Sequence, residues 1–379
     1  MREVAILGVG QTPVREHWDI SLRGLAVEAG RAALVDAGVD QVDAIYVSNM
    51  NSDRLNGQRH LGPLVADYLG QRGVEAVKLE AACGSAGSAM RQGILAVAGG
   101  ELDCVLVIGA EKLTETPGRQ TTAALATAAD ADYEVEHGIT FVGLNALIMR
   151  RYMHEYGYSH SDFAPFALTA HANAARNPNA LYRYAIDQRE YDRGRDVADP
   201  IRLYDASPIG DGAAALLLVP ADRAPDAVRV AGSASATDTV AVHDREDMLR
   251  LRAAELSSAR AYAQAGVGPE DIDLFELHDA FSIMAALSLE ACGFAGRGDG
   301  VRLGLAGDIN RGGRIPISTM GGLKARGHPV GATGLYQLVE ATLQLRGDAG
   351  ALQVEGARTA MTQNIGGSGA TIVTHILKR

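Results

Sequence analysis

The sequence predicts an α/β protein whose helices and strands form layers around a mostly parallel or mixed sheet. Three observations predict this class. Buried strands alternate with amphipathic helices, part of that pattern recurs in the second half of the chain, and a helix-rich segment interrupts the first half. A chain of 379 residues with 47% hydrophobic content has ample material for a large core divided into subdomains.

The first part of the chain carries the alternating pattern. Each predicted strand is a short apolar run, and each predicted helix repeats its apolar residues at intervals of three and four. The pattern predicts strands at 3–10, 44–49, 76–81 and 104–111, a helix over 22–38, and another helix after Cys83.

The stretch from 115 to 204 is richer in His, Tyr, Arg and Asn, and it has helical patterns at 146–157 and 162–178. We interpret this stretch as an insertion built of helices and loops. The strand pattern returns at 210–219. The predicted domains are an N-terminal half made of 1–114 and 205–225, the inserted domain 115–204, and a C-terminal half, 226–379.

An internal repeat relates the two halves. In 32–47 a helix ends at a glycine and the chain enters a strand, and 261–277 has the same pattern with a slightly longer connection. The first predicted strand and that at 104–111 also have counterparts, at 228–234 and 359–367. A repeated α/β unit creates a cleft between its halves, where catalytic groups from each can meet.

Composition excludes several functions. The net charge of −11 and the absence of a Lys/Arg run disfavour nucleic acid and anionic membranes as partners. The N-terminal apolar run is too short for a signal peptide or a membrane span. The three cysteines, Cys83, Cys104 and Cys292, have no metal-binding spacing and are too few for a disulfide framework. We therefore expect a cytoplasmic protein without a metal.

Cys83 is the candidate nucleophile. It lies between a predicted strand and a helix that starts with Gly84, Ser85, Ala86 and Gly87. The N–H groups at a helix N-terminus favour an anion, so this position is expected to lower the pKa of the thiol. The small neighbours let a substrate approach. Cys104 and Cys292 fit buried structural positions instead.

Two histidines and a glycine loop in the second half strengthen this interpretation. His328 lies in "KARGHPVGATG" at 324–334, and His278 lies in "ELHDAF" at the end of a buried strand. The segment "QNIGGSGA" at 363–370 is a tight loop that can offer backbone donors to a developing oxyanion.

Together, Cys83 and its helix, "GHPVGATG", "DGAAA" and the terminal glycine loop resemble the thiolase superfamily in order and spacing over nearly the whole chain. "GHPVGATG" is the most specific of these motifs. "HDAF" is closer to the "HDCF" of the sterol-carrier-protein type than to the "NEAF" of biosynthetic and degradative thiolases. The segment "HANAARNP" resembles archaeal and bacterial thiolases of the same subgroup.

The resemblance implies a five-layered αβαβα fold with two duplicated halves and an inserted loop domain, in a dimer or tetramer. It implies that Cys83 takes an acyl group from an acyl-CoA, and that His328 accepts the thiol proton and helps to bind a thioester oxygen. His278 would stand where the asparagine of "NEAF" holds an oxyanion-hole water. The N–H groups of Cys83 and Gly366 would form a second oxyanion hole.

The pattern departs from the family at one point. Thiolases carry a second cysteine that moves a proton at the α-carbon of the incoming acyl group. The two positions at which relatives keep it are Asn364 and Ala280 in this chain. Cys292 lies too far along the helix after His278 to substitute. The sequence therefore predicts the acyl-transfer half-reaction more firmly than the condensation.

Three hypotheses follow. The first is an acetyl-CoA acetyltransferase or 3-ketoacyl-CoA thiolase in which His278 or another polar group moves the α-proton. The second is an acyltransferase acting on a different carbon nucleophile, in a complex with a synthase-like subunit and a small protein with an OB-fold and a zinc ribbon. The third is a retro-aldol lyase on sterol-side-chain CoA esters, with Tyr336 as a candidate acid or base, or a non-catalytic acyl-CoA-binding subunit.

Other candidates are weaker. His137 and His171 lie in the inserted domain, and surface or capping roles are expected for both. The N-terminal "ILGVGQTP" lacks the dinucleotide-binding spacing, so no redox cofactor is expected. Coenzyme A is expected as substrate or product.

Overall fold

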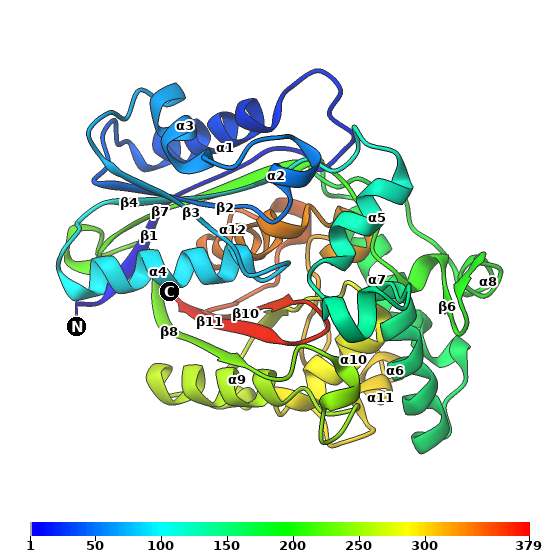
Figure 1. Ribbon diagram of the computed structural model, residues 1–379. Helices are drawn as coiled ribbons and strands as arrows, with labels where there is room; N and C mark the ends of the chain where they lie inside the picture. Colours follow the sequence, from blue (N-terminus) through cyan, green and yellow to red (C-terminus); the bar gives the residue numbers. More distant parts are fainter. Residues whose placement is uncertain (1) are drawn as a thin grey trace.

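The computed structural model describes residues 2–379, and its elements form five layers (Figure 1). One outer layer contains α1 (Leu22–Ala37) and α3 (Leu61–Tyr68), and the opposite outer layer contains α9 (Arg252–Ala265) and α10 (Ser282–Ala291). Between them, two layers of strands enclose α4 (Ser85–Gly99) and α12 (Thr333–Arg346). The predicted layered α/β fold is confirmed.

Nine strands form one hydrogen-bonded array in the order β3-β2-β4-β7-β1-β8-β11-β10-β9. Their bounds are β1 Val4–Gln11, β2 Ala44–Ser48, β3 Glu75–Leu79, β4 Val105–Glu111, β7 Gly212–Pro220, β8 Val228–Thr237, β9 Leu274–Glu276, β10 Thr359–Gly366 and β11 Thr371–Lys378.

The strand order repeats in the two halves. In the first half β2 is parallel to β4, which is antiparallel to β7, which is antiparallel to β1. In the second half β9, β10, β11 and β8 follow the same sequence of orientations. The two copies are joined edge to edge where Val4–Ile6 of β1 pairs with Val228–Val230 of β8.

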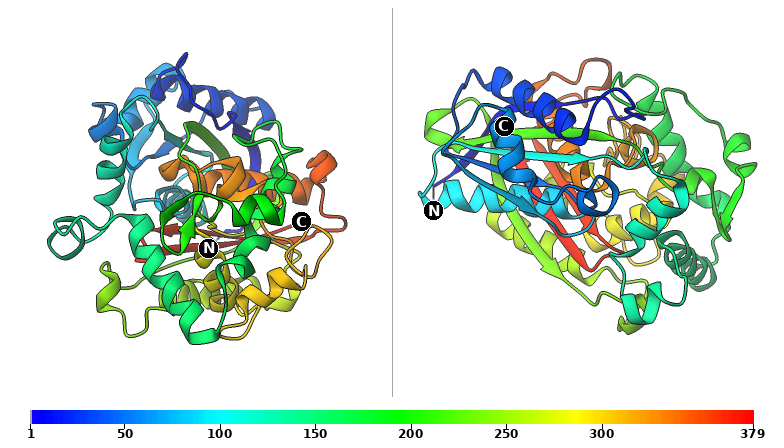
Figure 2. Two further views of the ribbon diagram at one scale, coloured as in Figure 1. Left: turned by 90° about the vertical axis from the view of Figure 1, so that its right-hand side faces the viewer. Right: turned by 45° about the horizontal axis from the view of Figure 1, so that its top comes forward.

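The predicted helix ends are present in both copies. α1 ends at Gly38 and α9 ends at Gly266, and each glycine has a positive φ, of 65° and 63° respectively. A left-handed residue just after a helix turns the chain and lets its N–H reach the last carbonyls, and glycine adopts this conformation without strain. Figure 2 shows α1 lying over the strands in its right-hand view.

The two central helices are buried because strands lie on both sides of them. Twelve of the fourteen residues of α12 are buried, including Gln337 and Glu340. α4 buries a stripe of small and apolar residues that includes Ala86, Ala89 and Met90. A helix that is enclosed on all sides carries few exposed polar residues, which explains its weakly amphipathic sequence.

The segment between β4 and β7 forms a body of helices at one end of the layers (Figures 1 and 2). Its elements are α5 Gly118–Ala126, α6 Phe141–Tyr156, α7 Ala164–Ala174, α8 Gln188–Asp192, β5 Asp196–Ala198 and β6 Ile201–Arg202. Although the first half contains it in sequence, its apolar residues share one core with the second half, as Ile148 and Phe166 do with Ile283. Two short helices complete the fold, α2 Ser52–Leu55 and α11 Gly300–Leu305.

Candidate active site

Three of the four predicted site residues line one cavity of about 200 Å³. Cys83 lies just before α4, His278 follows β9, and His328 lies in the loop before α12. Gly366 ends β10 and does not line the cavity, whereas Gly367 does. The two halves therefore bring the nucleophile and both imidazoles to one place, as the repeat predicted.

The turn that presents Cys83 is strained. Ala82 has a φ of 53°, which is unusual for a residue with a side chain. The Ser85 hydroxyl accepts from the Ala81 N–H at 2.9 Å and donates to the Ala82 carbonyl at 2.5 Å. These bonds hold the sharp turn between β3 and α4, which places Cys83 on the wall of the cavity.

The Cys83 thiol is protonated at rest, contrary to the expectation of a lowered pKa. Burial, and after it the Glu111 carboxylate, raises its pKa to about 12. The N–H groups of Cys83 and Gly367 favour the thiolate, but they do not outweigh burial. The thiol must therefore lose its proton as it attacks, and a base has to lie close by.

His328 is positioned by both backbone and side chain. Its N–H donates to the Pro208 carbonyl at 3.2 Å, and its Nδ1 lies 2.8 Å from the Thr333 hydroxyl at the start of α12. Burial lowers its pKa well below the ordinary value, with further contributions from His278 and Arg326. The imidazole is neutral near pH 7, as a general base must be.

His278 faces His328 edge to face, with ring centroids 5.1 Å apart and an angle of 85° between the rings. Burial lowers the pKa of His278 to about 3, and Arg326 contributes to the shift. Both imidazoles are therefore uncharged, and the two neutral rings lie on the wall of the cavity that Cys83 also lines.

Neither position expected for a second thiol supplies a proton carrier. Ala280 lines the cavity with a methyl group. Asn364 is buried, and its Nδ2 lies 3.0 Å from the Cys83 carbonyl and 3.3 Å from His278 Nδ1. Cys292 is buried away from the cavity and accepts from Gln363 Nε2 at 3.1 Å, and Cys104 lies just before β4 and outside the cavity. The described residues thus place one cysteine at the site.

The glycine loop after β10 is held from outside the cavity. The buried Arg245 donates through Nη2 to the Ser368 carbonyl. Gly367 has a φ of 63°, and it is the N–H of this residue that favours the Cys83 thiolate. Sequence motifs indicated the loop but missed Gly367 as the donor, and nothing near Arg245 in the sequence signals its role.

The segment before β7 connects both histidine loops. The Ser207 N–H donates to the Ala280 carbonyl at 2.8 Å, and Ile209 forms an isolated parallel bridge with His328. Asp211 then accepts from the N–H groups of Leu113, Thr114 and His17 at 2.7, 3.0 and 3.0 Å. Asp211 belongs to the predicted "DGAAA" motif, and its contacts explain why an acid precedes this buried strand.

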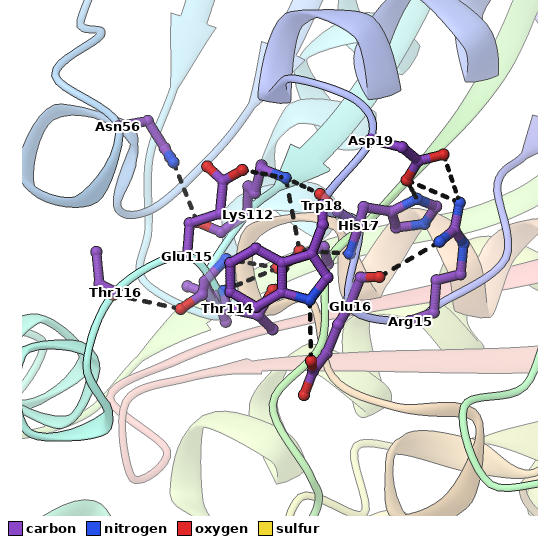
Figure 3. Close-up of polar contacts among 12 residues, drawn as sticks. Arg15, Glu16, His17, Trp18, Asp19, Asn56, Lys112, Thr114, Glu115 and Thr116 are labelled. Atoms are coloured by element: carbon purple, nitrogen blue, oxygen red, sulfur yellow. Dashed lines mark hydrogen bonds and ion pairs between the residues drawn. The ribbon is translucent and has the colours of Figure 1, made fainter.

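Lys112 lies beside the same junction and is 1% exposed. It pairs with Glu115 at 3.0 Å and donates to the His17 carbonyl (Figure 3). The end of β4 and the connection from β1 to α1 are therefore joined by a buried cation, which supports the loops under the site without entering it.

The rest of the cavity wall is mostly apolar. Its side chains come from the inserted segment and from both halves: Leu125, Phe141, Val142, Ile209, Phe281, Met284, Val330 and Ile365. Such a lining suits an apolar acyl group next to a polar reaction centre. A larger open groove of about 650 Å³ lies along α4 and β8, but its lining has no cysteine or histidine.

Three weaker candidates from the sequence do not line the cavity. His137 is exposed on a turn, and His171 is buried among tyrosines. Tyr336 is buried, and its hydroxyl donates to the Thr12 carbonyl at 2.9 Å. Within residues 2–379 there is no cluster of His, Cys, Asp and Glu suited to a metal ion, and none of the helices described there could cross a membrane.

The layered fold and its cysteine–histidine site define a member of the thiolase family, to which this chain belongs. The model of the thiolase N-terminal domain matches residues 4–222, and that of the thiolase C-terminal domain-like family matches residues 234–379. The first model ends just after β7 and the second begins within β8, so the passage from the first copy of the repeat to the second lies between them.

Individual relatives lie within that family. The chain is 45% identical to an acetyl-CoA acetyltransferase of Methanothermobacter thermautotrophicus, over the full length of both. It is 31% identical to sterol carrier protein 2 of Bos taurus, covering 98% of this chain and 71% of that protein. A solved structure titled "Ltp2-ChsH2(DUF35) aldolase" superposes with a TM-score of 0.87 at 26% identity, covering 99% of this chain and 97% of the other.

Proposed function

We propose that the protein is an acyl-CoA C-acyltransferase that forms or cleaves 3-ketoacyl-CoA esters, such as acetoacetyl-CoA, through an acyl-Cys83 intermediate. The observation that carries the proposal is the convergence of Cys83, His278 and His328 on one apolar-walled cavity. The similarity to an acetyl-CoA acetyltransferase over the whole chain supports the same reaction class.

In the first half-reaction, the Cys83 sulfur attacks the thioester carbonyl of an acyl-CoA. The pKa of about 12 means that this sulfur gives up its proton during the attack, and His328 is the neutral base in the cavity that can take it. The proton then passes to the departing CoA sulfur, and an acyl-cysteine remains. N–H donors at the cavity, including that of Gly367, stabilise the oxyanion that forms on the way.

In the second half-reaction, the α-carbon of another acyl-CoA loses a proton and attacks the acyl-cysteine carbonyl. The new carbon–carbon bond forms as the bond to the Cys83 sulfur breaks, and the thiol is restored. Cleavage runs through the same steps in reverse. Coenzyme A enters only as part of substrate or product, and the proposal includes neither a redox cofactor nor a metal.

The proposal is tested by incubating the purified protein with acetyl-CoA and measuring its intact mass. We expect one acetyl group per chain, located on Cys83 by peptide mapping, and its absence in Cys83→Ser. Cys104→Ser is the matched control, since it removes a half-buried thiol outside the cavity and should keep the adduct. A wild-type protein without an adduct would refute the proposal.

A second function is favoured by the single thiol at the site and by the structural similarity to an aldolase that contains a DUF35 protein. In it the chain transfers an acyl group to another carbon nucleophile within a complex, or cleaves a CoA ester by a retro-aldol step. The purified chain would then acetylate Cys83, or bind acyl-CoA, without cleaving acetoacetyl-CoA. Co-expression with a DUF35-type partner would be needed to restore turnover.

The proposal includes a cytoplasmic location, inferred from the three cysteines that form no disulfide framework, and a homodimer or tetramer, carried over from the resemblance to thiolases. Light scattering on the purified protein measures the number of chains per particle. A single chain per particle at assay concentrations would remove the oligomer from the proposal without affecting the chemistry at Cys83.

A further inference from the structure

The orientation of the Asn364 side-chain amide is determined by two of its contacts. The Gly87 N–H, in the first turn of α4, donates to Asn364 Oδ1 at 3.0 Å. Asn364 Nδ2 in turn donates to the Cys83 carbonyl at 3.0 Å. An N–H can bond only to the amide oxygen and a carbonyl only to the amide nitrogen, so the two ends of the amide cannot be exchanged.

The third contact of this amide then assigns the tautomer of His278. Nδ2 lies 3.3 Å from His278 Nδ1. Because an amide nitrogen donates hydrogen bonds and does not accept them, His278 Nδ1 must accept with its lone pair. The single proton of the neutral ring is therefore on Nε2. Protonation of Nδ1 would turn two hydrogens toward each other, which opposes the imidazolium form of His278.

Three elements make room for this amide. A Cβ on Gly334 of α12 would lie 2.4 Å from Asn364 Oδ1, and a Cβ on Gly87 would lie 3.2 Å from the same atom. Asn364 itself is 2% exposed. The amide is thus buried where α4, α12 and β10 meet, and close packing prevents its rotation.

His328 has a different kind of partner. Its Nδ1 lies 2.8 Å from the Thr333 hydroxyl, which can rotate to donate or to accept. Nε2 of His328 can therefore gain and lose a proton while the ring keeps its orientation. Arg326 and His278 are the charged and titratable groups that act on His328, and Arg326 acts on His278.

We propose that Asn364 is a positioning residue that holds His278 as a hydrogen-bond donor through Nε2, and that His328 alone carries the proton in both half-reactions. This proposal rests on the proposed acyltransferase function. It assigns to His328 the proton transfer that a second thiol performs in other thiolases. In the condensation, His328 takes the proton from the α-carbon and returns it to the Cys83 sulfur when that sulfur leaves the acyl group. No further acid or base is needed for the protons to balance.

The first experiment reads the tautomer in the wild-type protein. We expect long-range ¹H–¹⁵N correlation spectra of protein labelled with ¹⁵N-histidine to show His278 with a bare Nδ1 and a protonated Nε2 near pH 7. The signals are assigned by their loss in His278→Gln. A protonated Nδ1 would overturn the proposal, whatever the activity of the protein.

The second experiment reverses the contact. Asn364→Asp keeps an oxygen for the Gly87 N–H but offers only acceptors to His278, so the proton should move to Nδ1. With the Nε2 donor lost, kcat should fall by roughly 10²–10³, as for removal of one oxyanion donor. Asn310→Asp is the matched control, since this exposed asparagine accepts from Thr169 through Oδ1 outside the cavity. An unchanged tautomer in folded Asn364→Asp would contradict the proposal.

The third experiment assigns the proton carrier. Exchange of the methyl protons of acetyl-CoA with deuterated water should persist in His278→Gln, which keeps an N–H donor, and should be lost in His328→Asn. The opposite pattern would make His278 the base and refute the proposal. If the wild-type protein forms no acetyl adduct, the acyltransferase function fails, while the tautomer result stands on its own.

Discussion

At the scale of single residues, opposing effects act on the pKa of the Cys83 thiol. The N–H groups of Cys83 and Gly367 favour its thiolate, whereas burial and Glu111 favour the thiol and prevail. A thiol that stays protonated until a base takes its proton is protected from oxidation and from alkylation between turnovers, because the thiolate is the reactive form. A base that lines the same cavity therefore has to take the thiol proton at the moment of attack.

Glu111 is a second residue whose hydrogen bonds could not be expected from its place in the sequence, because its partners lie far along the chain. Its carboxylate accepts from the N–H groups of Met50, Asn51 and Gly331 at 2.8, 3.1 and 3.0 Å, and from Asn49 Nδ2 at 2.9 Å. Gly331 follows the His328 loop closely. Glu111 thereby joins the end of β4, the loop after β2 and the start of α12.

Glu111→Ala leaves the three backbone N–H groups without their acceptor, and Asn49 Nδ2 keeps only its bond to the Ala110 carbonyl. We expect the free energy of unfolding to fall by about 3 kcal/mol or more, since each unsatisfied buried donor costs roughly 1–3 kcal/mol before relaxation. Chemical denaturation measures the loss. Glu101→Ala changes an exposed glutamate and should stay within about 0.5 kcal/mol of wild type. Equal effects of the two substitutions would show that the Glu111 contacts contribute little.

At the scale of elements, the approach of α4 and α12 to β10 depends on glycines. Helical patterns predicted α1 and the helix after Cys83 correctly, because local periodicity records which side of a helix is buried. The roles of Asn364, Gly367 and Arg245 could not be predicted in this way. Asn364 touches Gly87 across 277 residues of sequence, and Arg245 reaches Ser368 across 123. The motifs indicated where catalytic groups gather, but not which atoms meet.

Two alanine substitutions separate this packing from helix propensity. Gly334→Ala places a methyl group 2.4 Å from Asn364 Oδ1, so we expect a loss of about 1–3 kcal/mol in the free energy of unfolding, together with reduced turnover. Gly99→Ala, at the end of α4, has no heavy atom within 4 Å of the added carbon. This control should be neutral or stabilising by up to about 1 kcal/mol. Thermal unfolding and activity assays compare them, and a tolerated Gly334→Ala would contradict the packing argument.

At the scale of the whole molecule, several ionisable residues are buried between the layers. Burial and nearby Glu340 raise the pKa of Glu276 to about 8, and burial raises the pKa of Glu111 to about 7. Burial also lowers the pKa of Lys324 to about 8. The fold therefore holds these groups closer to neutrality than an unfolded chain would.

This burial predicts a pH dependence of stability between pH 6.5 and 8. In that range the unfolded chain has lost the Glu276 proton, whereas the folded protein keeps it, so the unfolded state binds fewer protons and stability falls as pH rises. The buried histidines and Lys324, whose pKa values are lowered, act in the opposite direction, so the contribution of Glu276 is measured against Glu276→Gln. We expect urea unfolding to show that the wild-type protein loses roughly 1–2 kcal/mol relative to Glu276→Gln between pH 6.5 and 8. A difference between the two proteins that stays constant over this interval would contradict the prediction.

The place of β7 in the strand order bears on how a growing chain folds during synthesis. β7 hydrogen-bonds to both β4 and β1, yet it is encoded after the whole inserted segment. Until Gly212 and the residues after it leave the ribosome, β1 has neither of its neighbours, because β8 is translated later still. Both edges of β1 therefore stay unpaired while most of the first half is synthesised. During that time the cell has to prevent the nascent strand from pairing with other chains.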